Sequence, residues 1–170
     1  MTLLDFSKVH PDFQDTLPPF TNRKPTILFK RLSDNVQLPT YGTTLASCFD
    51  FYSPNEAPIL IGPGETLLVK TGLEAIIPAG YSLRLHARSG LAVKSGIVLA
   101  NGQGIVDEDY REEIGIALRN TSTMQFRLDP QTRIAQGELV LDVRADVQEY
   151  YGDVYRVSER SGGFGSTGVH

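Results

Sequence analysis

Six residues near the C-terminal end of the sequence combine small, hydroxyl-bearing and aromatic side chains at close spacing. Residues 163–168 read Gly-Phe-Gly-Ser-Thr-Gly and match the pattern G-x-G-x-x-G. That pattern binds dinucleotides where a strand leads into a helix, but only Val169 and His170 follow here, too few for a helix. Backbone N–H groups and hydroxyls suit phosphate oxygens, and Phe164 suits the face of a base. The segment is therefore either a binding arm or a plain polar tail.

A second group of chemically able residues begins at Arg88-Ser89-Gly90. Ser89 is a good N-cap, residues 91–94 can form a helical turn, and Gly96 is a natural helix stop. A short helix that opens in this way presents N–H groups, a hydroxyl and a guanidinium at one point. This combination is typical of an anion site. The alternative is an ordinary capped helix with an exposed arginine.

A third group lies between residues 101 and 111, where Val106 is followed by Asp107-Glu108-Asp109 and then Tyr110. The pattern predicts a β-hairpin with an acidic corner. Carboxylates in turns usually cap their own backbone, but three beside a tyrosine exceed what a turn needs. One of them could act as a general base for water, and Tyr110 could pack beneath a sugar.

The overall charge excludes some classes of partner. The 170 residues include 16 Lys and Arg against 20 Asp and Glu, and no basic run occurs. Binding to a nucleic-acid backbone demands clustered cations, so nucleic acid is not expected as a partner. A phosphorylated small molecule needs only a few local cations and remains compatible with this composition.

Cysteine and histidine content, together with hydropathy, predicts a cytoplasmic protein. The lone cysteine, Cys48, rules out an internal disulfide and fits a reducing compartment. The three histidines have no ligand spacing, so a zinc site is not expected. No apolar run approaches the ~18 residues of a membrane span, and the acidic N-terminal residues are unlike a signal or transit peptide.

Short strands between glycine and proline residues are the elements that must position these groups. Strands are predicted at 27–32, 67–71, 73–77, 81–87, 114–119 and 139–143. Many short strands with regular turn signals predict a sandwich, barrel or jelly roll. Residues 1–25 carry four prolines and are predicted to be an irregular N-terminal extension.

These pieces, in this order, resemble the trimeric dUTPase family over about residues 27–168. Each motif alone is a weak signal, whereas five in register with matching spacing are a strong one. The five motifs of that family are placed at residues 46–53, 88–92, 104–111 and 133–136 and in the C-terminal Gly-rich segment.

The resemblance implies an all-β subunit, a jelly-roll-like distorted β-barrel with one short helix, assembled as a homotrimer with active sites at subunit interfaces. It implies a β domain at residues 26–157 and a flexible arm at residues 158–170 that closes on the nucleotide. The implied reaction is hydrolysis of dUTP to dUMP and pyrophosphate with Mg²⁺. That reaction keeps uracil out of DNA and supplies dUMP for dTTP synthesis.

The resemblance also implies a role for each site residue. Asp107 would be the base that activates water, Tyr110 would pack on deoxyribose and exclude a 2′-hydroxyl, and Asp50 would bind the metal through water. The remaining implied contacts are Asn101, Gly104, Ile105 and Gly115 to uracil; Arg88, Ser89, Gly90 and Gln136 to phosphates; Phe164 stacked on uracil; and Arg160, Gly165, Ser166 and Thr167 over the phosphate tail.

Four positions depart from the family pattern. Cys48 and Glu112 each replace a glycine, and Gly137-Glu138 interrupts an apolar stretch. One residue separates Arg160 from Gly162, where the family usually has two, which shortens the register of Arg160 with Phe164.

Other functions are also compatible with these residues. The chain could be a dCTP deaminase, or a bifunctional relative, of the same fold. It could also be a nucleotide-sensing regulatory trimer, with residues 1–25 and Glu112 serving an unknown protein partner. A purely structural jelly roll gives no reason for Arg88-Ser89, Asp107 and Phe164 to occur together.

Overall fold

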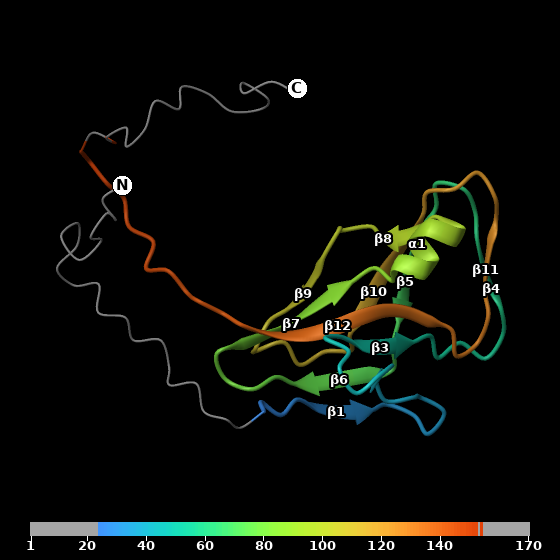
Figure 1. Ribbon diagram of the computed structural model, residues 1–170, viewed down its shortest axis with the longest axis horizontal. Helices are drawn as coiled ribbons and strands as arrows, with labels where there is room; N and C mark the ends of the chain where they lie inside the picture. The colour runs from blue at the N-terminus through green and yellow to red at the C-terminus, as the bar shows by residue number, and fades with distance from the viewer. Residues whose placement is uncertain (1–23, 153, 155–170) are drawn as a thin grey trace.

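A computed structural model describes residues 24–152 and residue 154, and within them the chain folds into twelve strands and one short helix (Figure 1). The elements are β1 (Leu28–Arg31), β2 (Thr40–Tyr41), β3 (Phe49–Tyr52), β4 (Ile59–Ile61), β5 (Thr66–Lys70), β6 (Leu73–Ile76), β7 (Tyr81–His86), α1 (Ser89–Ser95), β8 (Ile97–Leu99), β9 (Gly104–Val106), β10 (Gly115–Asn120), β11 (Phe126–Leu128) and β12 (Arg133–Leu141).

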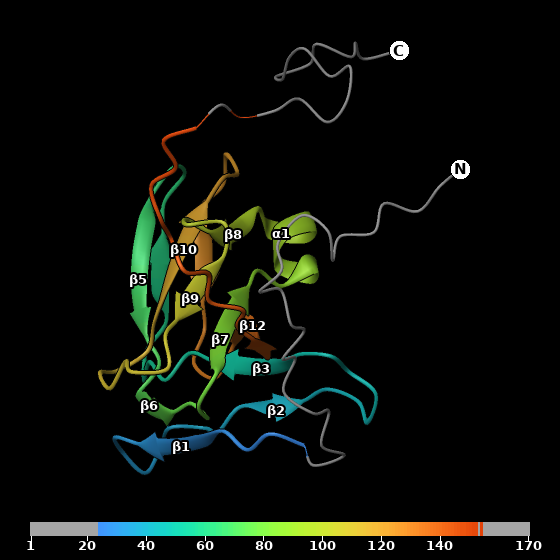
Figure 2. The same cartoon turned by 90° about the vertical axis from the view of Figure 1, so that its left-hand side faces the viewer.

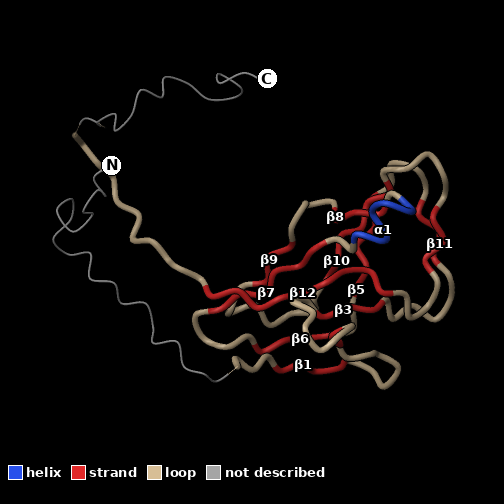
Figure 3. The backbone as a smooth tube through the Cα atoms, viewed as in Figure 1, coloured by secondary structure: helices blue, strands red, loops and turns tan. Residues whose placement is uncertain are grey.

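The strands form four antiparallel sheets that share one core (Figure 3). The largest has the order β2-β3-β12-β7-β9, and a second has the order β5-β10-β8. The pairs β1-β6 and β11-β4 complete the arrangement. Within the described residues these sheets do not close into a barrel. The expected all-β, jelly-roll-like subunit with one short helix is confirmed.

The central sheet has one apolar and one polar face, because side chains alternate along each strand. Phe49 and Phe51 of β3 are buried on the apolar face, and each makes an edge-to-face contact with Phe29 at 5.9 Å between ring centroids. A Cβ on Gly137 would lie 2.7 Å from the Phe51 ring, so this strand position requires glycine. Gly137-Glu138 therefore lies inside β12 and does not interrupt it.

The helix begins one residue earlier than the sequence indicated. Ser89 was expected to be the N-cap, and this was wrong: Arg88 occupies that position with extended backbone (φ −81°, ψ 124°) and no side-chain cap. The stop at Gly96 is confirmed, because its φ of 66° is left-handed and its N–H bonds to the carbonyl oxygens of Leu91 and Ala92.

The predicted hairpin around residues 101–111 is not a paired ladder. β9 pairs with β7, whereas β10 pairs with β5 and β8. The segment between Val106 and Gly115 therefore crosses from one sheet to another. Close approach of β9 to β7 depends on Gly104, where a Cβ would lie 3.0 Å from the Cβ of Leu85.

Strand β12 begins earlier and ends earlier than the strand predicted at 139–143.

Beyond β12 the described residues run away from the body of the protein (Figures 1 and 2). Val143, Val147 and Tyr151 are exposed along this stretch. Residues 1–23, 153 and 155–170 lie outside the described part, so the proposed extension at 1–25 and the arm at 158–170 stay predictions. Among the described residues, no helix has the length and apolar character needed to cross a membrane.

Candidate active site

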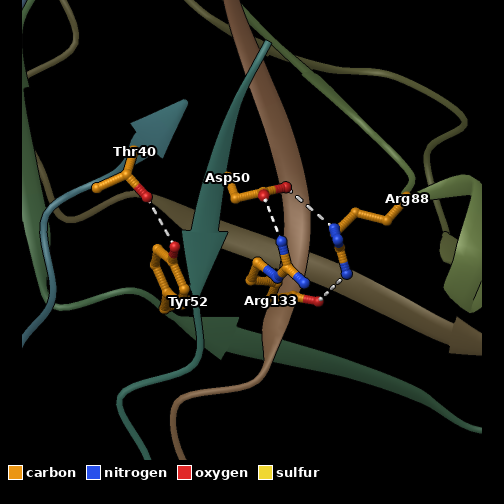
Figure 4. Close-up of polar contacts among 5 residues, drawn as sticks. All are labelled: Thr40, Asp50, Tyr52, Arg88 and Arg133. Atoms are coloured by element: carbon orange, nitrogen blue, oxygen red, sulfur yellow. Dashed lines mark hydrogen bonds and ion pairs between the residues drawn. The ribbon is translucent and has the colours of Figure 1, made fainter. Parts of the chain in front are cut away.

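Asp50 is the centre of a charged cluster on the polar side of β3 (Figure 4). Its carboxylate is buried and accepts hydrogen bonds from Arg88 Nε at 3.0 Å and Arg133 Nη1 at 3.2 Å. Arg88 Nη1 also donates to the carbonyl oxygen of Arg133 at 3.3 Å. A buried carboxylate is stable only when it is paired, so Asp50 fixes the position of both guanidinium groups.

Strand register explains why these residues meet. Asp50 of β3 lies opposite Gln136 of β12, and Gln136 lies opposite His86 of β7. Directly opposed residues point to the same face of a sheet. Arg88 follows β7 by two residues and reaches back over this face to Asp50.

The predicted phosphate-binding residues therefore gather at one end of the central sheet. Ser89 and Gly90 are exposed at the start of α1, directly after Arg88, and Gln136 is half-buried beside the cluster. Guanidinium, amide and backbone N–H groups are all donors. This end of the sheet can bind an anion with several oxygen atoms.

Asp107 and Tyr110 form a tight turn after β9. The Tyr110 N–H donates to the carbonyl oxygen of Asp107 at 3.1 Å, and the Tyr110 hydroxyl donates to the carbonyl oxygen of Glu113 at 3.0 Å. Asp107 is exposed, and none of the described residues bonds to its carboxylate. The carboxylate is thus available to accept a proton from water.

The residues implied for uracil border the same crossing segment. Gly104 and Gly115 exclude side chains, since a Cβ would lie 3.0 Å from Leu85 and 2.9 Å from Leu68 respectively. Ile105 is 54% exposed, and Asn101 is brought beside β10 by the hydrogen bond from the Ala100 N–H to the Ala117 carbonyl oxygen at 2.8 Å. Backbone groups rather than side chains are presented at the two glycines.

Within the described residues, the predicted phosphate-binding residue Arg88 and the predicted base Asp107 lie far apart along β7. Val106 pairs with Leu83, so Asp107 is level with Ser82 near the start of β7. Arg88 lies six residues further along the same strand direction, which at the usual strand rise is roughly 20 Å away. The predicted site residues therefore form two clusters at opposite ends of β7.

Sequence reasoning missed three charged residues that shape these clusters. Arg133 belongs to the fourth motif but had no assigned role, although it shares Asp50 with Arg88. Glu108 lies within the Asp107–Tyr110 turn and Glu113 follows it, and both bond to backbone N–H groups elsewhere in the fold. Their long-range partners left no local signal in the sequence.

Five predicted site residues lie outside the described part of the chain: Arg160, Phe164, Gly165, Ser166 and Thr167.

Two titratable groups near the polar face have shifted pKa values. Burial raises the pKa of the Cys48 thiol, and the negative charges of Glu138 and Asp50 raise it further. The hydrogen bond from Arg84 lowers the pKa of Asp142, against a smaller opposing effect of burial and with help from Ser82. Cys48 is therefore a protonated, weakly nucleophilic thiol.

The described residues do not build a metal cage of their own. No group of three or more His, Cys, Asp or Glu side chains in this part of the chain is placed to hold an ion. Both oxygens of Asp50 accept hydrogen bonds from arginine. Mg²⁺ commonly binds through one or two carboxylates together with substrate phosphates and water, and such a mode needs no cage.

Known proteins resemble this chain in sequence and in fold. A protein named deoxyuridine 5′-triphosphate nucleotidohydrolase from Chlamydia pneumoniae is 40% identical over 142 residues, which cover 84% of this chain and 98% of that protein. A protein of the same name from Caulobacter vibrioides is 38% identical over 147 residues, which cover 84% of this chain and 94% of that protein. The dUTPase of Staphylococcus bacteriophage 80alpha, solved with dUPNHPP, superposes with a TM-score of 0.75 at 26% identity, over 86% of this chain and 100% of that one.

A dUTPase variant from phage phi11 of S. aureus, whose structure concerns a structural Mg(II) ion, shares the fold with a TM-score of 0.68 at 19% identity, over 75% of this chain and 98% of that one. The family model for dUTPase matches residues 34–168. With that match and relatives near 40% identity over most of its length, the chain belongs to the dUTPase family.

Proposed function

We propose that this chain hydrolyses dUTP to dUMP and pyrophosphate. The observation that carries the proposal is the Asp50 cluster, where one buried carboxylate orients Arg88 and Arg133 beside Gln136 in a chain of the dUTPase family. Oriented cations are what a triphosphate requires, because its oxygens repel an attacking nucleophile until their charge is neutralised.

In the proposed reaction Asp107 is the general base. It removes a proton from a water molecule, whose oxygen attacks the α-phosphorus. A new P–O bond forms, the bond between the α-phosphorus and the bridging oxygen breaks, and pyrophosphate leaves with that bond's electrons. A positioned base of this kind contributes typically about 10²–10⁴ to the rate. Arg88 and Arg133 stabilise the charge on the phosphate chain.

We further propose that each site is shared between copies of the chain in a homotrimer. The roughly 20 Å between Asp107 and Arg88, from the strand rise, is too long for both to act on one phosphate group within one copy. One copy would supply the Asp50 cluster and another the Asp107–Tyr110 turn. The arm at residues 158–170 would close over the nucleotide.

Substrate choice follows from the crossing segment. Backbone groups near Gly104 and Gly115 would pair with uracil, and cytosine would leave buried donors and acceptors unpaired. Tyr110, whose hydroxyl is tied to the Glu113 carbonyl oxygen, would pack against deoxyribose and leave no room for a 2′-hydroxyl.

Mg²⁺ would enter with the triphosphate and neutralise part of its charge. A carboxylate has about four acceptor positions, and Asp50 uses two of them for guanidinium groups. A further position can accept a water molecule of the hydrated ion, which fits the implied contact through water.

Pyrophosphate release from dUTP, dCTP and dTTP in the presence of Mg²⁺ tests the proposal. We expect release from dUTP and little from the other two nucleotides. Ammonia release from dCTP would identify a deaminase instead. Nucleotide binding without turnover would identify a regulatory sensor, and no binding would leave only a structural role.

A further inference from the structure

Two glutamates, Glu108 inside the Asp107–Tyr110 turn and Glu113 shortly after it, form hydrogen bonds with distant parts of the fold. Glu108 Oε2 accepts a hydrogen bond from the Gly80 N–H at 2.8 Å. Glu113 Oε1 accepts one from the Gly72 N–H at 2.7 Å. Both bonds are partly buried, so they are shielded from competing water.

Both glycines lie in turns that backbone hydrogen bonds hold, from the Leu32 N–H to the Gly72 carbonyl oxygen at 2.9 Å and from the Tyr81 N–H to the Pro78 carbonyl oxygen at 3.1 Å. Gly72 joins β5 to β6 and Gly80 precedes β7, with φ values of 70° and 79° that favour glycine. A side chain at Gly72 would collide with Val36. The residues on either side of Gly72 both bond to Ile114. The Thr71 N–H donates to the Ile114 carbonyl oxygen at 3.0 Å, and the Ile114 N–H donates to the Leu73 carbonyl oxygen at 2.8 Å.

The backbone of each glutamate holds the residues of the turn. The carbonyl oxygen of Glu108 accepts a hydrogen bond from Arg111 Nη1 at 2.6 Å, and Arg111 Nη1 also bonds to the Tyr110 carbonyl oxygen at 2.9 Å. The carbonyl oxygen of Glu113 accepts the Tyr110 hydroxyl at 3.0 Å. Each glutamate thus connects a hydrogen-bonded glycine turn with the segment that carries Asp107 and Tyr110.

We propose that Glu108 and Glu113 are positioning residues that clamp the Asp107–Tyr110 turn between the Gly80 and Gly72 turns. This proposal rests on the proposed dUTP hydrolysis. Glu108, next to Asp107, fixes the direction of the catalytic carboxylate. Glu113, bonded to the Tyr110 hydroxyl through its backbone, fixes the ring that would contact the sugar.

Hydrogen-bond acceptance, rather than negative charge, is the property that the clamp uses. Glu108 lies 3.5 Å from Arg144 and Glu113 lies 3.4 Å from Lys70, but both cations are mostly exposed. Exposed ion pairs contribute little. A glutamine keeps an acceptor oxygen for the glycine N–H and loses the charge, so it should preserve the clamp, whereas alanine should not.

The experiment compares Glu108→Ala, Glu108→Gln, Glu113→Ala and Glu113→Gln with the wild-type chain. Glu112→Ala is the matched control, because Glu112 is exposed and makes no hydrogen bond to any described residue. Four quantities are measured: kcat for dUTP, KM for dUTP, the ratio of kcat/KM between dUTP and UTP, and amide hydrogen exchange of residues 72–80 and 107–113.

We expect Glu108→Ala to lower kcat at least about 10-fold with KM changed by less than about 3-fold, since a displaced catalytic group loses rate rather than binding. Glu113→Ala should raise KM and reduce the preference for dUTP over UTP about 10-fold. Both alanine variants should exchange about 10-fold faster at residues 107–113. The glutamine variants and Glu112→Ala should stay within about 3-fold of wild type.

Several results would overturn the clamp. These are wild-type kcat and KM in both alanine variants, glutamine variants that lose as much as alanine, or exchange at residues 107–113 that does not change. A wild-type chain that releases no pyrophosphate would overturn the proposed function instead. If the wild-type chain is inactive, hydrogen exchange still tests the clamp. Faster exchange in the alanine variants but not in the glutamine variants would support it.

Discussion

Asp50 and Arg88 form a hydrogen-bonded ion pair, with Asp50 Oδ1 3.0 Å from Arg88 Nε. The Asp50 side chain is only 5% exposed and that of Arg88 is 22% exposed, so the pair is held at the boundary of the core. Arg88 Nη1 is also engaged, by the Arg133 carbonyl oxygen. Among the described residues Nη2 has no hydrogen-bond partner, and this leaves one face of the guanidinium for a phosphate oxygen.

Asp50→Asn should therefore weaken both folding and substrate binding. The change keeps the shape of the side chain but removes the charge that Arg88 and Arg133 share. We expect the free energy of unfolding to fall by about 1–3 kcal/mol, less than for a fully buried pair because both guanidinium groups can still reach water. We expect KM for dUTP to rise. Urea unfolding and steady-state kinetics check the two effects.

Asp129→Asn is the matched control for that substitution. Asp129 accepts from Arg127 Nε at 2.7 Å in the same kind of pair, but both side chains are more than half exposed. Its loss should cost less than about 1 kcal/mol and leave KM unchanged. Equal losses in the two variants would contradict the role assigned to Asp50.

Asp107→Asn should leave dUTP binding nearly intact and reduce turnover. The amide cannot accept the proton of the attacking water, so we expect the rate of the chemical step to fall by about 10²–10⁴. Single-turnover kinetics with equilibrium binding separates the two quantities. A variant within a few-fold of wild type would move the base elsewhere, and Asp109 in the same turn is the next candidate.

Two inactive variants should restore activity when their subunits mix. Arg88→Ala and Asp107→Asn damage clusters at opposite ends of β7, so a shared site can draw the intact cluster from each copy. We expect activity in a refolded mixture to exceed that of either variant alone by at least about 10-fold. Absence of recovery despite proven exchange of subunits would contradict shared sites.

Asp142→Asn should lower stability at neutral pH but not in acid. The hydrogen bond from Arg84 at 2.7 Å, opposed by burial and helped by Ser82, lowers the pKa of Asp142 in the folded state. A lowered pKa contributes stability above the ordinary value of about 3.9, and the contribution disappears as the pH falls below it. Urea unfolding at pH 7 and pH 3 should show a difference from wild type that shrinks in acid. A difference that stays constant would contradict the assignment.

Cys48 should react slowly with alkylating reagents. Burial, then the charges of Glu138 and Asp50, raise its pKa, and only the thiolate is reactive. At pH 8 we expect iodoacetamide to modify Cys48 several-fold more slowly than N-acetylcysteine. Glu138→Gln should increase the rate only about 2–3-fold, because burial is the larger cause. A rate equal to that of N-acetylcysteine would show that the thiol is not shielded.

Local features of the fold could be predicted from the sequence because their causes are local. Alternation of apolar residues identified β7 and β10, and the end of α1 followed from Gly96, whose left-handed backbone suits glycine. Motif order and spacing identified the family, and the roles of Asp50, Arg88 and Asp107 that it implies remain predictions. The arm at residues 158–170 and its contacts remain predictions.

Only the tertiary structure decided which strands pair and which charges meet. A period of two tells which face a residue occupies but not which strand lies beside it, so the sequence suggested a hairpin where β9 in fact pairs with β7. Asp50 and Arg133 are 83 positions apart and meet only because β3 and β12 are neighbours. Glu108 meets Gly80 because β9 and β7 are neighbours. Asp107 lies far from Arg88 because the two residues lie at opposite ends of β7. Such long-range relationships depend on the packing of the whole core, which no short window of sequence encodes.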